Sequence, residues 1–314
     1  MNLEPLRGQR MLVAGAGTLL GQSLIRVLRE MDLVELCGLD APDAAFRDAA
    51  ATEQLFARER PTHVIVVAGR SGGIAANRRT PVDLMLDNLR VVAAVLPAAH
   101  RSAVRALIYV ASSCIYPRET PQPMSPDALF SGVLERTSEA YSVAKLAGTV
   151  LCQAYRDQHR DRFVVGVAGD AYGPGADFDP ENAHVVAGLV RRMHDARLLG
   201  ASTFPVWGTG RQVRDLVYVD DLARAVLLVL ATYDGRTPVN LSSGIGTSIA
   251  DLSAVVRDVV GFRGEIVFDA THPDGAPMKV LDADPILQMG FAPRTALREG
   301  VELTYRWFLA HSDR

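Results

Sequence analysis

A glycine-rich turn near the N-terminus is the feature that most constrains the fold. Residues 11–14 form a short apolar run typical of a buried strand, and residues 23–29 carry apolar side chains at helical spacing. The connection contains Gly15, Gly17 and Gly21, and glycine permits both a tight turn and close approach of the backbone to a ligand. Strand, glycine turn and helix in this order predict the first βα unit of a sheet that can hold a dinucleotide pyrophosphate.

The alternation of strand and helix patterns continues through the first half of the chain. Further strands are predicted at 34–39, 63–67, 106–110 and 163–167, with helices between them at 52–58, 81–100 and 139–158. Alternating elements favour a mostly parallel sheet with helices on both faces. The sequence therefore predicts an α/β fold with a Rossmann-like doubly wound parallel sheet.

The pattern loosens after about residue 168, where Pro, Gly and Asp concentrate. We expect residues 1–167 to form a dinucleotide-binding domain and residues 168–314 to form mainly a smaller C-terminal substrate-binding lobe. A helix rich in Ala, Val and Leu at 222–230 predicts that residues 213–235 return to the first domain.

Charge and composition exclude several classes of function. The net charge is -3 and no long basic block is present, which argues against a nucleic-acid partner because clustered cations are needed to displace counterions from phosphates. Neither an apolar leader nor an apolar stretch of roughly 18 to 20 residues appears, so we expect a soluble, cytoplasmic protein without a membrane partner. The scattered Cys37, Cys114 and Cys152 predict reduced thiols rather than disulfides or a metal site.

Tyr141 and Lys145 are the strongest candidates for chemistry. Four residues apart on a predicted helix, they share a face, so the ammonium can lower the pKa of the phenol. Ser112 follows the predicted strand 106–110, and strand carboxyl ends are where α/β sheets place ligands. The three together predict proton transfer to a carbonyl or alcohol oxygen, whereas the spacing alone is also produced by a surface lysine on an amphipathic helix.

Asp40 is a candidate for reading the cofactor ribose. It ends the second predicted strand, where a carboxylate can bind the ribose hydroxyls of NAD and would repel the 2'-phosphate of NADP. A capping or turn aspartate is the alternative. Arg47 lies several residues later and is a poor clamp for a 2'-phosphate.

Cys114 and His184 are candidates of a weaker kind. Cys114, two residues after Ser112, would point to the same side if the segment is extended, and a nearby cation would make its thiol a base, although free cysteines are usually packing residues. His184 begins a predicted helix whose apolar face contains Val185, Leu189 and Met193, where a histidine is often structural.

A family resemblance connects these residues. The chain resembles the GDP-L-fucose synthase branch of the extended short-chain dehydrogenase/reductase family from about residue 9 to about residue 312. The stretches that carry the resemblance are 72–77 (GGIAAN), 112–117 (SSCIYP), 141–148 (YSVAKLAG), 172–174 (YGP), 182–184 (NAH), 207–210 (WGTG), 214–221 (RDLVYVDD) and 273–279 (PDGAPMK).

The resemblance implies roles for these residues. Cys114 and His184 would be the acid/base pair that moves protons at C3 and C5 of a GDP-linked 4-keto sugar, while Ser112 and Tyr141 hold the C4 oxygen. Tyr141, assisted by Lys145, would then give a proton as hydride reaches C4. The cofactor-binding residues assigned on this basis are Gly15, Gly17, Thr18, Leu19, Leu20, Gly21, Asp40, Ala68, Gly69, Asn88, Tyr141, Lys145, Ala168 and Asp170. The substrate-binding residues are Ser113, Asp170, Arg192, Trp207, Arg214 and Lys279.

Several departures from the family pattern bear on the cofactor and the sugar. Gly17 takes the place of a basic residue that usually contacts NADPH, so the cofactor, NADP(H) or NAD(H), is expected to lean toward NAD(H) together with Asp40. Asp170 replaces an asparagine at the sugar and nicotinamide, and an ionised carboxylate accepts hydrogen bonds but donates none. Met278 replaces an arginine before Lys279. A changed sugar, a changed cofactor or loss of one half-reaction is expected.

Three functions remain open at this stage. The first is an epimerase and reductase acting on a GDP-linked 4-keto sugar. The second is an NAD-dependent epimerase or a C4-reductase alone, acting on another GDP-sugar such as a heptose. The third is a dinucleotide sensor without catalysis. The Ala, Val and Leu stripes of the helices at 81–100 and 139–158 are consistent with a homodimer, as in relatives, or with core packing alone.

Overall fold

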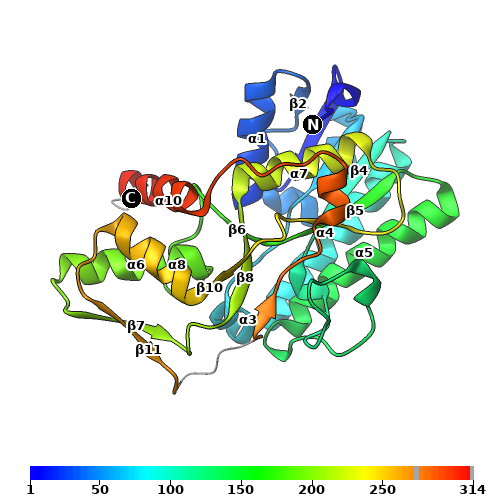
Figure 1. Cartoon of the computed structure of the whole chain (residues 1–314). Helices are drawn as coiled ribbons and strands as arrows, with labels where there is room; N and C mark the ends of the chain where they lie inside the picture. Colours follow the sequence, from blue (N-terminus) through cyan, green and yellow to red (C-terminus); the bar gives the residue numbers. More distant parts are fainter. Residues whose placement is uncertain (272–275, 312–314) are drawn as a thin grey trace.

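The computed structural model describes residues 1–271 and 276–311. Its largest sheet is six-stranded and parallel throughout, in the order β2-β1-β3-β4-β5-β9 (Figure 1). The strands are β1 (Arg10–Ala14), β2 (Glu35–Cys37), β3 (His63–Val66), β4 (Ala106–Ser112), β5 (Phe163–Ala168) and β9 (Val239–Leu241). The predicted doubly wound parallel sheet is confirmed. Strand β2 is shorter than predicted because Gly38, at φ +65°, turns the chain out of the extended conformation.

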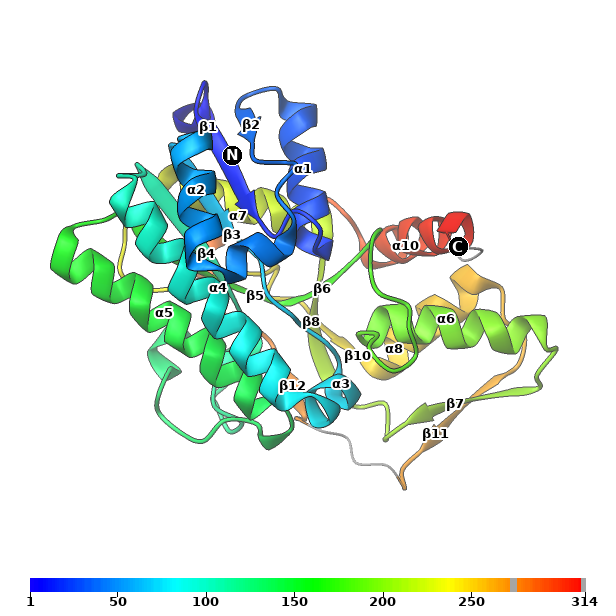
Figure 2. The same cartoon turned by 180° about the vertical axis from the view of Figure 1, so that it is seen from behind.

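Helices cover both faces of this sheet. Helices α1 (Leu19–Met31) and α7 (Val219–Thr232) pack together on one face, and α2 (Ala49–Glu59), α4 (Pro81–Arg101) and α5 (Glu139–His159) pack on the other (Figure 2). Each face has its own buried apolar cluster against the strands. Within the described ranges, no helix is both long enough and apolar enough to cross a membrane.

A second, smaller lobe is built from several segments of the second half of the chain (Figures 1 and 2). It contains α6 (Val185–Leu198), α8 (Ile249–Val260), α10 (Leu297–His311), β7 (Thr203–Trp207) and β11 (Glu265–Asp269), around a third apolar cluster. Strands β6 (Asp170–Tyr172), β8 (Val213–Tyr218), β10 (Gly246–Ser248) and β12 (Met278–Lys279) form a small sheet at the junction of the lobes.

The remaining described elements are short. They are α3 (Ile74–Arg79), α9 (Asp284–Gln288) and five 3-10 turns: η1 (Glu4–Leu6), η2 (Asp43–Arg47), η3 (Ser113–Ile115), η4 (Pro126–Ala128) and η5 (Arg136–Ser138). Two of these turns, η2 and η3, carry residues of interest for function.

The chain returns to the large sheet over a different range from the predicted 213–235. Strand β8 pairs with β6, β10 and β12, so the return begins with α7, and β9 extends it beyond residue 235 as the last strand of the sheet. Strands β8 and β9 are adjacent in sequence to α7 but find hydrogen-bond partners in different sheets. The division at residue 167 into two domains stays a prediction.

Candidate active site

A cavity of about 380 Å³ lies outside the carboxyl ends of the parallel strands. Strand order reverses between β1 and β3, and α/β sheets bind ligands in the crevice at such a reversal. The predicted site residues that line the cavity are Gly17, Thr18, Leu19, Leu20, Gly69, Ser112, Tyr141, Lys145, Ala168, Asp170 and His184. Residues predicted from six separate stretches of sequence therefore share one cavity.

The glycine turn packs so closely that side chains are excluded from it. A Cβ on Gly15, which has φ +101°, would lie 2.4 Å from the Ala68 nitrogen, and one on Gly21 would lie 1.9 Å from the Gly15 oxygen. Thr18 begins α1 as its N-cap, where its Oγ1 accepts from the Gly21 N–H at 3.1 Å and donates to the Gly15 oxygen at 2.8 Å. The turn thus presents the N-terminus of a long helix to the cavity, which suits a pyrophosphate.

The segment after β3 forms a second backbone wall. Gly69, at φ +112°, leaves no room for a Cβ, which would lie 2.3 Å from the side-chain oxygen of Asn88. The Asn88 amide donates to the backbone oxygens of Arg70 at 2.9 Å and Leu84 at 2.7 Å, and its buried Oδ1 has no partner among the described residues. The glycine turn and this segment both offer backbone without side chains, which lets a dinucleotide approach closely.

Tyr141, Lys145 and Ser112 meet where β4 faces α5. Tyr141 is hydrogen-bonded to Ser112, and Lys145 donates to the Val110 oxygen at 3.4 Å with its Nζ 5.8 Å from the Tyr141 ring centre. The expected lowering of the Tyr141 pKa is not found: burial raises it, and the hydrogen bond from Ser112 only partly offsets this. Burial also lowers the pKa of Lys145 to about 8. Tyr141 is consequently held as a protonated donor.

Cys114 lies beside a cation rather than on an extended segment. The chain turns into η3 directly after Ser112, so the expectation of an extended segment with both side chains on one side is wrong; Ser112 accepts from the Cys114 N–H at 3.3 Å as the cap of this turn. The half-buried Cys114 Sγ instead lies 3.8 Å from the Nζ of Lys279. Burial by itself lowers the pKa of Lys279, but Cys114 and Asp170 outweigh it and the net shift is upward.

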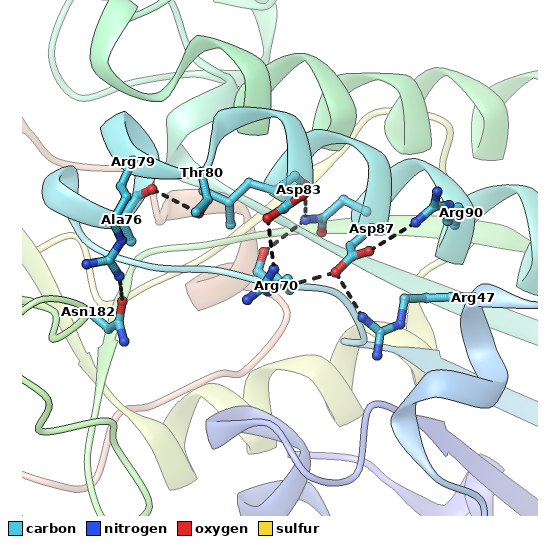
Figure 3. Close-up of polar contacts among 11 residues, drawn as sticks. Arg47, Arg70, Ala76, Arg79, Thr80, Asp83, Asp87, Arg90 and Asn182 are labelled. Carbon is cyan, nitrogen blue, oxygen red and sulfur yellow. Dashed lines mark hydrogen bonds and ion pairs between the residues drawn. The ribbon is translucent and has the colours of Figure 1, made fainter.

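His184 is placed by contacts between two of the quoted motifs. The Gly73 N–H donates to the Asn182 oxygen at 3.1 Å, and a Cβ on Gly73 would lie 2.8 Å from the Ala183 oxygen. Arg79 of α3 donates to the Asn182 side chain at 3.1 Å (Figure 3). These contacts fasten α3 to the loop that ends at His184, the exposed N-cap of α6, whose side chain lines the cavity.

The four remaining substrate candidates form two pairs outside the cavity lining. On the second lobe, the Arg192 guanidinium lies 5.6 Å from the Trp207 ring, donates to the Pro205 oxygen at 2.7 Å and has its pKa lowered by burial. The Trp207 side chain is 62% exposed. At the junction sheet, Arg214 and Lys279 stand opposite each other in the β8–β12 register. Residues 273–275 of the quoted motif before Lys279 lie outside the described residues.

Asp40 and Ser113 do not line the cavity either. Asp40 is 76% exposed in its side chain and forms an ion pair with Arg58 of α2 at 3.2 Å. Ser113 is buried within η3 and does not line the cavity.

The structure also draws attention to residues to which the sequence analysis gave no role. Arg70 and Ser71 line the cavity after β3, where the glycine at 69 was the only signal. Asp215 of β8 is buried, which raises its pKa to about 6 although Ser242 and the Leu281 N–H both donate to it, and Asp170 raises it further. No periodic pattern marked Asp215 because it lies in a strand of mixed burial.

Comparisons with known proteins agree with this arrangement. The model of the NAD dependent epimerase/dehydratase family matches residues 11–242. GDP-L-fucose synthase 1 of Arabidopsis thaliana is 39% identical over 303 residues, covering 96% of this chain and 94% of that protein. A GDP-L-fucose synthetase of Naegleria fowleri, solved with NADP, superposes with a TM-score of 0.90 at 26% identity, covering 97% and 94% of the two chains. A Campylobacter jejuni GDP-mannoheptose C4 reductase with NADP bound superposes with a TM-score of 0.84 at 25% identity over 96% and 98%. The chain therefore belongs to the NAD dependent epimerase/dehydratase family, and its relatives there include the GDP-L-fucose synthases.

Proposed function

We propose that this enzyme epimerises and then reduces a GDP-linked 4-keto sugar. The observation that carries the proposal is one cavity that collects the glycine turn, the Ser112–Tyr141 hydrogen bond and His184. Cys114, two residues after Ser112, lies beside Lys279 and is not itself among the lining residues. Removal of protons from carbons beside a ketone requires acid/base side chains, which a thiol and an imidazole can supply.

A nicotinamide dinucleotide suits the first part of the site. The Gly15–Gly21 turn and the Gly69 segment would hold its pyrophosphate, since both exclude side chains and the turn leads into the N-terminus of α1. When bound there, the cofactor supplies the hydride that reduces the C4 ketone. The remaining chemistry belongs to the side chains of the protein.

Proton transfer beside the ketone is assigned to Cys114 and His184. Protons on C3 and C5 are acidic because they flank the C4 carbonyl, so a base can remove one and leave an enolate. The Ser112 and Tyr141 hydroxyls would donate hydrogen bonds to the enolate oxygen. The Lys279 ammonium lies 3.8 Å from the Cys114 sulfur, where it would stabilise the negative charge of a thiolate acting as the base. One residue removes the proton and the other returns a proton to the opposite face.

The reduction uses the same hydroxyl pair. As hydride adds to C4, the carbonyl oxygen gains negative charge and takes the Tyr141 proton, giving a neutral alcohol and a phenolate. The Lys145 ammonium beneath the ring stabilises that phenolate. Below pH about 8 this lysine is charged, in agreement with its lowered pKa.

The GDP end is assigned to the two lobes around the junction sheet. Arg192 and Trp207 offer a guanidinium beside an exposed indole, which suits a phosphate and a base or sugar face. Arg214 would add a second guanidinium from β8. Lys279 would serve the diphosphate as a point charge in addition to its contact with Cys114.

Asp170 favours a second candidate function, a C4-reductase of another GDP-sugar such as a heptose. This carboxylate lines the cavity and lies close enough to Lys279 and Asp215 to raise the pKa of both. A carboxylate in this place selects a sugar that presents a hydroxyl donor, so the accepted hydroxyl pattern differs from that chosen by an amide.

A homodimer through α4 and α5 forms part of the proposal. An apolar surface groove runs between these helices; its lining residues are Leu89, Val92, Ala93, Phe130, Val143, Leu146, Ala147, Val150, Leu151 and Ala154. Phe130, one of these lining residues, is 65% exposed. Contiguous apolar surface of this kind marks an interaction site, and a two-fold axis would place the same face of both copies together.

Turnover of GDP-4-keto-6-deoxymannose tests the proposed function. Wild-type protein is expected to oxidise NADH or NADPH in its presence, followed by absorbance. Tyr141→Phe is expected to lose reduction by about 10²-fold or more because it removes the proton donor. Tyr155→Phe, on the same helix but outside the cavity lining, is the matched control and should keep full activity. Silence of the wild type with both cofactors would contradict the proposal for this sugar.

A further inference from the structure

The carboxylate of Asp43 lies directly against the glycine turn. Asp43 begins the 3-10 turn η2, and a Cβ placed on Gly17 would stand only 2.8 Å from the Asp43 Oδ2. The side chain is half-buried, and within residues 1–271 and 276–311 it has neither a hydrogen bond nor an ion pair. The oxygens of such a carboxylate can accept hydrogen bonds from a ligand.

Asp43 is not itself among the lining residues of the cavity, but its neighbour Gly17 is. Gly17 lines the cavity together with Thr18 and Leu19, at the start of α1. A side chain at position 17 would occupy the space that the Asp43 carboxylate now fills. The Asp43 carboxylate therefore lies on the side of the glycine turn that faces η2, in the space that a side chain at position 17 would need.

The cations nearest in sequence are already paired elsewhere. Arg47, four residues along η2, donates to the carboxylate of Asp87 at 2.8 Å. Asp87 also faces Arg70 at 3.8 Å and Arg90 at 3.5 Å, and Figure 3 shows the three guanidinium groups converging on it. Asp87 of α4 thus partly neutralises the three arginines, and Arg47 is bound to it. Asp43 has no ion-pair partner within the described ranges.

We propose that Asp43, rather than Asp40, sets the choice of dinucleotide. Its carboxylate accepts hydrogen bonds from the ribose hydroxyls of NAD(H) and repels the 2'-phosphate of NADP(H), because like charges at close range disfavour binding. Asp40 cannot share this role as it stands, since its side chain is exposed and paired with Arg58. The inference rests on the proposed function only in needing a dinucleotide at the glycine turn.

Calorimetric titration of NADH and NADPH into the cofactor-free protein tests the inference without any sugar or turnover. The wild type is expected to bind NADH more tightly. Asp43→Asn keeps the shape of the side chain but removes the charge, so the ratio of the two dissociation constants should shift by about tenfold or more toward NADPH. Glu53→Gln is the control. Glu53 pairs with Arg101 outside the cavity lining, so removal of its carboxylate should leave the ratio unchanged.

The outcomes separate the inference from the proposed function. A wild type that prefers NADPH, or an unchanged ratio in Asp43→Asn with a wild-type melting temperature, would overturn the inference. A shift in Asp40→Asn but not in Asp43→Asn would return the role to Asp40. A change of the ratio of dissociation constants in Arg47→Ala alone would assign the choice of dinucleotide to the arginines around Asp87. If neither dinucleotide binds the wild type, the proposed function falls together with the inference.

Discussion

Cys114 shows how a single contact gives a residue its chemistry. By sequence it is a free cysteine two positions after a serine, and most such residues only fill space. Cys37 illustrates the usual case, because burial raises its pKa to about 11. Cys114 differs because Lys279, distant in sequence, brings an ammonium to within 3.8 Å of its sulfur. The predicted need for a nearby cation is met by a residue that had been assigned to phosphate binding.

Loss of that ammonium should make Cys114 less reactive. In Lys279→Gln, alkylation of Cys114 by iodoacetamide at pH 7.5 is expected to slow by about tenfold, since the thiolate is the nucleophile and its stabilising cation is gone. Peptide mapping by mass spectrometry reports each cysteine separately.

Arg211→Gln provides the control for charge alone. Arg211 is an exposed cation of the same lobe with hydrogen bonds to Thr209, and its removal should leave the alkylation rate unchanged. Equal rates in wild type and Lys279→Gln would show that the ammonium does not activate the thiol.

Helix α5 sets the position of Tyr141 and Lys145 through its packing on β4. Gly148, in the same helix, lies against the ring of Tyr109, and an added Cβ would stand 2.4 Å from its Cζ. Lys145 also sits over the Tyr109 ring, with its Nζ 5.3 Å from the ring centre. The absence of a side chain at position 148 therefore lets the helix approach the strand closely.

Gly148→Ala is expected to lower the free energy of unfolding by about 1–3 kcal/mol because the methyl group overpacks a buried contact. The measurement is urea unfolding followed by circular dichroism.

Gly188→Ala is the matched control in α6. There an added Cβ meets only the Ala183 Cβ at 3.7 Å, so the better helix propensity of alanine should raise stability by about 1 kcal/mol. If both substitutions changed stability in the same direction, the proposed close packing at position 148 would be wrong.

The sequence predicted some elements better than others for physical reasons. Helices α4 and α5 and strand β5 follow long or strongly apolar patterns, and their positions agree with the predictions to within a residue or two. Strands β6, β10 and β12 have three residues or fewer, too short for a periodic pattern, so the junction sheet was not predicted. The turn at Cys114 was missed because a 3-10 turn capped by Ser112 depends on local hydrogen bonding rather than periodicity.

At the scale of the whole molecule, the sequence predicted that separate stretches meet at one cavity better than it predicted how their side chains are arranged. The roles of these residues stay predictions. Strand carboxyl ends brought Ser112, Tyr141 and Gly17 to one cavity, as parallel-sheet geometry requires. The contact of Asp43 with Gly17 was not foreseeable, because it depends on how the chain turns between β2 and α2. The predicted cytoplasmic location and the exact domain division stay predictions.

The apolar groove gives the whole molecule a second testable property. Val143→Glu combined with Val150→Glu places two charges in the groove between α4 and α5, and it should convert the proposed dimer to a monomer by desolvation cost and repulsion. Sedimentation velocity measures the change.

Leu199→Glu is the control for this change, because Leu199 is 84% exposed at the end of α6 in the other lobe. It should leave the mass in solution unchanged. A wild type that sediments as a monomer would contradict the proposed dimer.

The central claim is that one cavity both moves protons beside C4 and reduces C4. The most direct test is incubation of the wild-type protein with GDP-4-keto-6-deoxymannose in D2O, first without and then with NADH or NADPH, reading sugar mass and nicotinamide absorbance. The account predicts deuterium at two carbons before any dinucleotide is added, followed by oxidation of the dinucleotide once it is present. Oxidation with no deuterium in the recovered sugar would contradict the account and leave a C4-reductase in which Cys114 and His184 move no protons.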